Sequence, residues 1–180
     1  MSESATANAM TCILVSPLSA VERTIEAQHP SHLITLLSPE HMIETPPQIA
    51  PERHLKLAVH DVVEEMAGSE SPASGHIVRL LDFAQGWKAD APLLVHCWAG
   101  VSRSTAAAYI LLCERIGPDR ELEIAYLLRR LAPHAYPNAL MIRHADTLLQ
   151  RDGRMIAAIA SIGRGEIVPE GSCVSLPIGL

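Results

Sequence analysis

Aromatic residues are scarce in this chain of 180 residues, since phenylalanine, tryptophan and tyrosine together make up only 3% of it. Apolar residues nevertheless make up 48%, so a core has to be built mainly from leucine, isoleucine, valine and alanine. A chain of this length buries a core of useful size without disulfide support. We therefore expect residues 1–180 to form a single domain.

Basic charge is also in short supply, with 14 lysine and arginine residues against 20 acidic ones and a net charge of -6. Non-specific nucleic-acid binding needs a basic footprint, so no nucleic-acid partner is expected. The acidic balance does not exclude an anionic substrate, because a small positive site can outweigh the field of the whole molecule.

No apolar run approaches the length needed to span a bilayer, so no membrane span is expected. Residues 1–10 lack the charged and apolar regions of a signal peptide. We expect this segment to be a flexible N-terminus.

Cysteine is limited to Cys12, Cys97, Cys113 and Cys173, with no CxxC pair and no histidine at ligand spacing. No metal site is therefore expected, and no cofactor is implied. Cys12 and Cys113 lie in apolar runs and are predicted to be buried small residues. Because a domain of this size needs no disulfides, a reducing, cytoplasmic location is expected.

Strands and helices are predicted to alternate, which indicates an α/β fold with a mostly parallel central sheet of four to five strands flanked by helices. Short apolar runs predict strands at Thr11–Ser16, His32–Leu37, Leu55–His60 and Pro92–His96. Helical periodicity and end signals predict helices at Ala20–Gln28, Ser74–Trp87, Ser102–Arg115, Arg120–Leu131, Asn138–Gln150 and Arg154–Ile162.

Local sequence signals indicate a helix cap, a loop and a terminal tail. Ser19 is predicted to cap the first helix, with Glu22 completing a capping box. The proline-rich stretch between Pro39 and Pro51 is predicted to be an ordered loop or a small irregular turn. Residues 164–180 are punctuated by glycine and proline and are expected to form an extended C-terminal tail on the surface.

The segment Leu93–Ala107 carries the chemistry: a buried strand, Cys97, a tight loop with Gly100, then Arg103 at the start of a helix. A loop in this place turns its backbone N–H groups toward the positive end of the helix dipole and binds a phosphate-sized anion. Arg103 adds a planar, permanently charged fork. A cation at a helix start opposes the dipole, and an anion between them explains the placement.

The same nest of N–H groups favours the thiolate form of Cys97, which makes that cysteine a candidate nucleophile. His96 is a candidate for orienting the loop. Phosphate, sulfate and vanadate are the anions expected to occupy such a loop.

The stretch HCWAGVSRS, from His96 to Ser104, resembles the signature loop of the cysteine-based protein tyrosine phosphatases, most closely in their compact, dual-specificity-like branch. The resemblance runs from about Leu55 to Leu149. It includes His60-Asp61, where this family carries a mobile general acid, and a segment from Arg130 to Pro137-Asn138 packed behind the loop. It implies a phosphatase-like fold.

The resemblance also implies roles for individual residues. The Cys97 thiolate attacks phosphorus, Asp61 protonates the leaving oxygen and then activates water, and Ser104 hydrogen-bonds the departing sulfur. Asn138 either supports the loop or only caps its own helix. Glu64 or Glu65 is an alternative to Asp61 as the acid. The expected phosphate-binding residues are Trp98, Ala99, Gly100, Val101, Ser102 and Arg103.

The substrate expected from this resemblance is a phosphorylated protein, mainly at tyrosine, or a small phosphomonoester. Relatives that act on inositol phosphates tend to carry lysine in the loop, and none lies between Cys97 and Arg103. Inositol-phosphate or phosphoinositide hydrolysis and a phospho-binding module without turnover remain alternatives. Rhodanese-like chemistry is weakest, because such loops lack the HCxxGxSR pattern.

Overall fold

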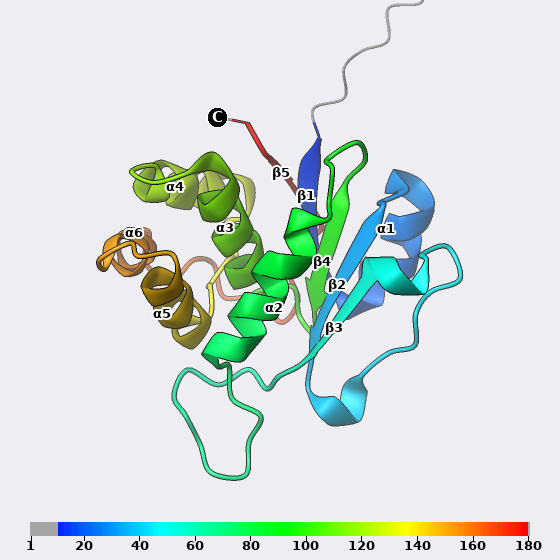
Figure 1. The fold of residues 1–180 in the computed structure, drawn as a ribbon, viewed down its shortest axis with the longest axis horizontal. Helices are drawn as coiled ribbons and strands as arrows, with labels where there is room; N and C mark the ends of the chain where they lie inside the picture. Colours follow the sequence, from blue (N-terminus) through cyan, green and yellow to red (C-terminus); the bar gives the residue numbers. More distant parts are fainter. Residues whose placement is uncertain (1–10, 180) are drawn as a thin grey trace, which may run out of the picture.

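The computed structural model describes residues 11–179 as a central five-stranded sheet with helices on both faces (Figure 1). The segment 1–10, expected to be flexible, lies outside the described residues. The strands are β1 Cys12–Pro17, β2 His32–Leu37, β3 His54–Ala58, β4 Leu93–Cys97 and β5 Val174–Pro177. The helices are α1 Val21–Gln28, α2 Ser74–Gln85, α3 Arg103–Ile116, α4 Glu121–Leu131, α5 Ala139–Leu148 and α6 Arg154–Ser161.

The strand order is β3-β2-β4-β1-β5, and all neighbours are parallel except β5, which is antiparallel to β1. The predicted α/β class with a mostly parallel sheet is confirmed. In the register, Val95 of β4 lies opposite Val15 on one side and Ile34 on the other. β4 is buried along its whole length, as expected of a parallel strand covered on both faces.

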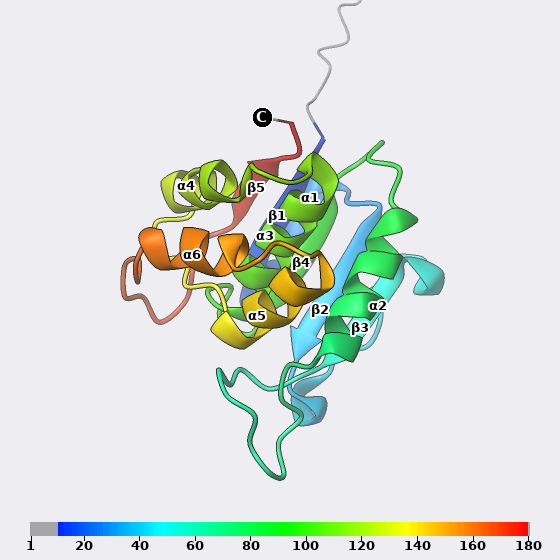
Figure 2. The same cartoon turned by 60° about the vertical axis from the view of Figure 1, so that its left-hand side comes forward.

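Helices divide unequally between the two faces of the sheet. α1 covers one face over a small cluster that includes Leu14, Ile25 and Leu94, whereas α2 to α6 cover the other (Figures 1 and 2). α3 lies in the middle of this helical layer, and its residues from Arg103 to Cys113 are all buried. The start of the helix that follows the signature loop is therefore held inside the core.

The edge at which the parallel strands end gathers the loops after β1, β3 and β4. In Figure 1 this is the lower edge of the sheet, where the long loop between β3 and α2 hangs below the core. Side chains from distant parts of the sequence meet there. Among residues 11–179, no helix combines the length and apolar character needed to cross a membrane.

The structure corrects two local predictions at the ends of the chain. Ser19 does not cap α1: Ala20 occupies that position without a side-chain bond, and Ser19 Oγ instead donates to Glu170 Oε1 at 2.7 Å. The tail expected at residues 164–180 does not lie wholly extended on the surface in its described part, residues 164–179, because β5 pairs with β1 and buries Val174 and Leu176.

Candidate active site

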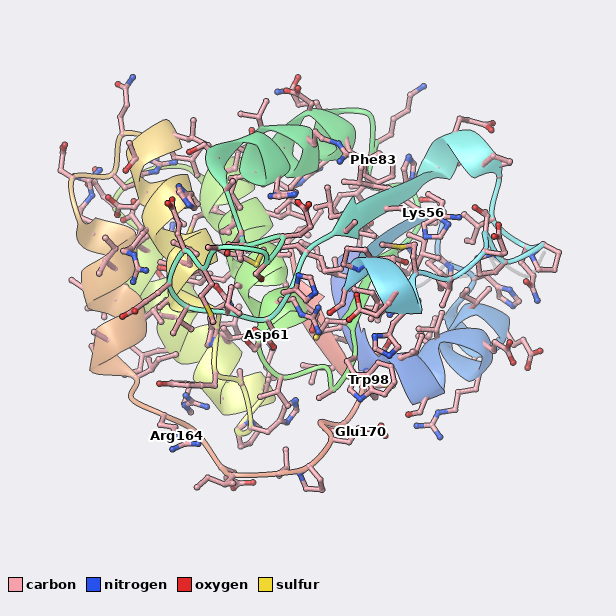
Figure 3. The ribbon with its side chains drawn as sticks, turned by 90° about the horizontal axis from the view of Figure 1, so that it is seen from below. Lys56, Asp61, Phe83, Trp98, Arg164 and Glu170 are labelled. Atoms are coloured by element: carbon pink, nitrogen blue, oxygen red, sulfur yellow. The ribbon has the colours of Figure 1, made fainter. Side chains whose placement is uncertain are left out.

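The signature loop connects two of the most buried elements of the protein. Cys97 is the last residue of β4, and Arg103 is the first of α3. Figure 3, which looks onto this end of the molecule, shows Asp61 and Trp98 on the same face. The predicted sequence of strand, tight loop and helix is thus present.

The carbonyl groups of the loop are bonded to backbone outside it. Neighbouring segments donate to four of them: Leu18 N to Trp98 O (3.0 Å), Gly171 N to Ala99 O (2.8 Å), Tyr136 N to Val101 O (2.9 Å) and Asn138 N to Ser102 O (3.3 Å). A peptide unit points its N–H opposite to its C=O, so carbonyls held outward leave amides directed inward. In the described part of the chain, the amides of residues 99–102 donate to no backbone acceptor. These donors are available to an anion.

Gly100 is required by the geometry of this loop. Its φ is +69°, and a Cβ atom there would lie 2.7 Å from Pro17 N and 2.9 Å from the carbonyl carbon of Ser16. Both contacts are with backbone that cannot move aside easily. Only glycine combines the left-handed conformation with this close approach to the end of β1.

Cys97 is 1% exposed, and its Sγ lies 3.1 Å from Ser104 Oγ in the first turn of α3. Ser104 is fully buried. The predicted contact between the candidate nucleophile and this hydroxyl is present.

Arg103 is a buried cation whose acidic neighbour, Asp61, lies beyond hydrogen-bond distance. It is 4% exposed, its Nη1 donates to Val59 O at 2.7 Å, and its Nε lies 3.7 Å from Asp61 Oδ2. Within residues 11–179, Nε has no hydrogen-bond partner. One neutral acceptor and one carboxylate beyond hydrogen-bond distance leave the guanidinium able to hold an anion.

Asp61 lies against the signature loop. Its Oδ1 accepts hydrogen bonds from Ser102 Oγ (2.7 Å) and Asn138 Nδ2 (2.9 Å), and its side chain is 37% exposed. Glu64 and Glu65 are exposed and make no hydrogen bond to the loop in the part of the chain that the structure describes. The geometry brings Asp61, and not its two acidic neighbours, to the loop.

Asn138 performs both of the tasks considered for it. Its Oδ1 accepts from the amides of Leu140 and Met141 and so caps α5. Its Nδ2 donates to Asp61 Oδ1 and to Val62 O, while its own amide donates to Ser102 O. One side chain thus connects the helix cap, the Asp61 segment and the signature loop.

The segment from Arg130 to Asn138 lies against the loop through the amides of Tyr136 and Asn138. The neighbouring Arg129 braces this region, donating to Pro133 O at 2.6 Å and to Gly163 O at 2.9 Å. Arg129, next to Arg130, is therefore the arginine that ties the segment after α4 to the end of α6.

His96 is fully buried and belongs to a chain of polar side chains that sequence reasoning missed. Its Nε2 lies 2.7 Å from Thr35 Oγ1, which lies 2.8 Å from His54 Nε2, and His54 Nδ1 lies 2.9 Å from Thr45 Oγ1. A hydroxyl has one hydrogen, so Thr35 donates to one imidazole and accepts from the other. The signal in the sequence is a lone threonine in the apolar run HLITLL.

His96 and His54 are both uncharged near neutral pH. Burial lowers the pKa of His96 to about 4, and burial together with the charge of Lys56 lowers the pKa of His54 to about 4. The residue before Cys97 is thus held as a neutral, oriented imidazole.

Trp98 lies at the rim of the loop and not beneath it. Its side chain is 53% exposed, and its ring meets His41 edge-on with centroids 4.9 Å apart. Tyr136, whose amide holds Val101 O, is 51% exposed. Two half-exposed aromatic residues thus belong to the surroundings of the loop. No cluster of three metal-ligating side chains occurs within residues 11–179.

Comparison with known proteins finds no matching family model and no matching curated protein. Solved structures do match. DUSP15 aligns with a TM-score of 0.61 and 16% identity over 82% of this chain and 88% of its own. PTPMT1 in complex with PI(5)P aligns with a TM-score of 0.54 and 16% identity, over 76% of this chain and 86% of its own. OH1 from the Orf virus, described as a tyrosine phosphatase, aligns with a TM-score of 0.53 and 19% identity, over 75% of this chain and 80% of its own.

Matches at identities this low show the fold alone. That fold agrees with the resemblance of the HCWAGVSRS loop. The chain has the fold of the cysteine-based protein tyrosine phosphatases, in the form taken by their dual-specificity-like branch.

Proposed function

We propose that this chain is a cysteine-dependent phosphatase that hydrolyses phosphomonoesters in proteins, with phosphotyrosine as its main substrate and dual specificity as an extension. The observation that carries the proposal is the position of Cys97 Sγ, 3.1 Å from Ser104 Oγ at the base of a loop whose carbonyls are bonded outward. The proposal is also supported by the carboxylate of Asp61 at the loop's edge.

In the first step the Cys97 thiolate attacks phosphorus, forming a P–S bond as the bond to the ester oxygen breaks. Asp61 transfers its proton to that oxygen, so the product leaves as a neutral alcohol or phenol. The guanidinium of Arg103 and the inward amides hold the three equatorial oxygens, where the transition-state charge is spread.

In the second step a water molecule attacks the phosphocysteine while Asp61, now a carboxylate, accepts its proton. The P–S bond breaks, inorganic phosphate leaves, and the sulfur departs as a thiolate. The Ser104 hydroxyl donates a hydrogen bond to that sulfur, which stabilises it as a leaving group. The cycle consumes one water and restores both side chains to their starting protonation.

Two features favour a singly phosphorylated aromatic substrate. Trp98 and Tyr136 offer half-exposed aromatic faces around the loop, against which a phosphotyrosine ring can stack. The positions between Cys97 and Arg103 hold no lysine to match a multiply charged inositol phosphate. The four cysteines are free thiols, which suits a reducing compartment such as the cytoplasm.

Purified protein with an aryl phosphate tests this proposal. Hydrolysis should persist in a chelator, stop with vanadate and vanish in Cys97→Ser. Cys173→Ser, at an exposed cysteine away from the loop, is the matched control and should keep wild-type activity. Full activity in Cys97→Ser would contradict the proposal.

The alternatives are separated by a substrate panel. Phosphopeptides and inositol phosphates are compared for turnover by wild type and for binding by Cys97→Ser. The proposal expects phosphopeptides to be turned over in preference. Tight binding without turnover would favour the phospho-binding module, and preferred turnover of inositol phosphates would favour the phosphoinositide alternative.

A further inference from the structure

A mainly apolar groove of about 350 Å³ lies beside the candidate active site. It runs between α5 and α6, with the segment before α5 and the segment after Asp61 forming further walls. Its apolar lining is Val63, Pro137, Ala139, Ile142, Ile156, Ile159 and Ala160. The volume is near the lower end of the range of about 300–1,000 Å³ usual for small-molecule sites.

The groove is continuous with the phosphate loop. Ser102 and Asn138 line it, and both are bonded to Asp61 Oδ1. Val63, two residues after Asp61, also lines the groove. A molecule whose phosphate is seated over the loop therefore has the groove directly next to it.

Two apolar side chains of this groove are partly open to solvent. Val63 is 50% exposed and Ile156 is 42% exposed. Partly exposed apolar side chains that line one groove beside polar groups are typical of a ligand-binding site. The groove therefore offers an apolar part of a ligand a place to be buried.

Two arginines give the groove a positive rim on a protein whose net charge is -6. The Arg164 guanidinium lies 5.5 Å from the centre of the Tyr136 ring, and Arg143 donates to Val63 O. Neither forms a salt bridge among residues 11–179. Figure 3 shows Arg164 on the same end of the molecule as Asp61. The rim is suited to a carboxylate.

We propose that this groove is a substrate-specificity site that receives an apolar side chain of the phosphoprotein close to the phosphorylated residue, with an acidic residue of the same segment at its arginine rim. The proposal rests on the proposed phosphatase function. A peptide segment is favoured over a lipid surface because anionic headgroups are bound by clusters of about four to eight lysines and arginines, whereas the basic residues lining this groove are Arg143 and Arg164. The small volume also suits one or two side chains better than paired acyl chains.

The test compares phosphotyrosine peptides that carry leucine or serine at each of the three positions on either side. Wild type should prefer leucine at one position or more, by about tenfold in kcat/KM, as burial of a leucine side chain predicts. Ala160→Trp fills the groove from an exposed position on α6. It should lower the peptide kcat/KM relative to that of an aryl phosphate by at least tenfold.

Ala157→Trp is the matched control, because Ala157 is exposed on the same helix but does not line the groove. It should retain the leucine preference. Arg164→Gln should remove a preference for peptides with glutamate over glutamine near the phosphotyrosine while keeping the preference for leucine.

Equal rates for leucine and serine peptides, or an undiminished preference in Ala160→Trp, would overturn the proposal. If Ala160→Trp slowed the hydrolysis of micellar phospholipid analogues and not that of peptides, the proposal would be overturned and the groove would be assigned to a lipid chain. If wild type hydrolyses no aryl phosphate, the phosphatase proposal fails separately. Binding of the same leucine and serine peptides to Cys97→Ser, measured by fluorescence polarisation, then still decides whether the groove reads an apolar side chain.

Discussion

Asp61 has one carboxylate oxygen that is fully engaged and one that is nearly free. Oδ1 accepts two hydrogen bonds, from Ser102 Oγ and Asn138 Nδ2, whereas Oδ2 has only the Arg103 Nε at 3.7 Å. A proton on this carboxyl group therefore belongs on Oδ2. This is the oxygen from which a leaving group would receive it.

Asp61→Asn keeps the size of the side chain but removes the transferable proton. We expect kcat on a phosphopeptide to fall by about 10²- to 10⁴-fold with little change in KM. Steady-state kinetics check this, with Glu64→Gln and Glu65→Gln as controls that should remain near wild type. A severe loss in either glutamate variant beside a mild one in Asp61→Asn would move the acid role to that glutamate.

Gly100→Ala tests the loop geometry at a single atom. The added Cβ would lie 2.7 Å from Pro17 N, so the loop must shift. Its amide N–H groups would then no longer point toward the same anion. We expect loss of most activity together with a lower melting temperature. Gly153→Ala is the control, because Gly153 also has a positive φ, of +85°, but no atom within 4 Å of its Cβ position. Equal effects in both variants would show that backbone strain alone is responsible.

Among the elements, the C-terminal segment departs most from prediction. The stretch from residue 163 to β5 passes behind the signature loop, where Gly171 N donates to Ala99 O, before β5 joins the sheet beside β1. A strand of four residues after glycine and proline punctuation carries little periodic signal. Its pairing with a strand some 160 residues earlier is set by the tertiary structure, and local sequence does not contain it.

β5 provides a matched pair of substitutions on opposite faces. Leu176 is fully buried, whereas Ser175 next to it is exposed. Leu176→Asp should lower the free energy of unfolding by roughly 2–5 kcal/mol, because it buries a charge without a partner. Ser175→Asp should change it by less than about 0.5 kcal/mol. Urea denaturation measures both, and similar small values would mean that β5 does not pack as described.

Elements with strong local signals were predicted well, and the site followed from them. β2 has the predicted bounds, and each of the six helices lies within two residues of its prediction at both ends. β3 ends at Ala58, two residues early, because His60 N donates to Glu70 O in the returning loop. The loop from Cys97 to Ser104 was predictable because its chemistry is contiguous in sequence. The contacts of Thr35 with His54 and His96 were not, because they cross three strands.

For the molecule as a whole, buried histidines set the response to acid. His54 and His96 have a pKa of about 4 when folded, below the ordinary 6.5, and burial also lowers the pKa of His32, His76 and His134. Between pH 4 and 6.5 the unfolded chain therefore binds more protons than the folded one. Stability is fully present above about pH 6.5 and is lost as the pH falls toward 4.

The free energy of unfolding, measured by urea denaturation at pH 5.0 to 7.5, should decrease steadily below pH 6.5. His54 and His96 each contribute at most about 1.4 kcal/mol per pH unit. His54→Gln should give a shallower slope, because it removes one of the groups. A flat profile in wild type, or equal slopes in both proteins, would contradict the assignment of neutral buried imidazoles.

Direct trapping of the intermediate tests whether Cys97 forms a covalent bond to phosphorus. Wild type or Asp61→Asn is mixed with a phosphotyrosine peptide, quenched in denaturant within the first turnover and analysed by peptide mass spectrometry. One phosphoryl group is expected on the peptide containing Cys97. Continued release of phosphate with this peptide unmodified, or with the phosphoryl group on another residue, would contradict this expectation.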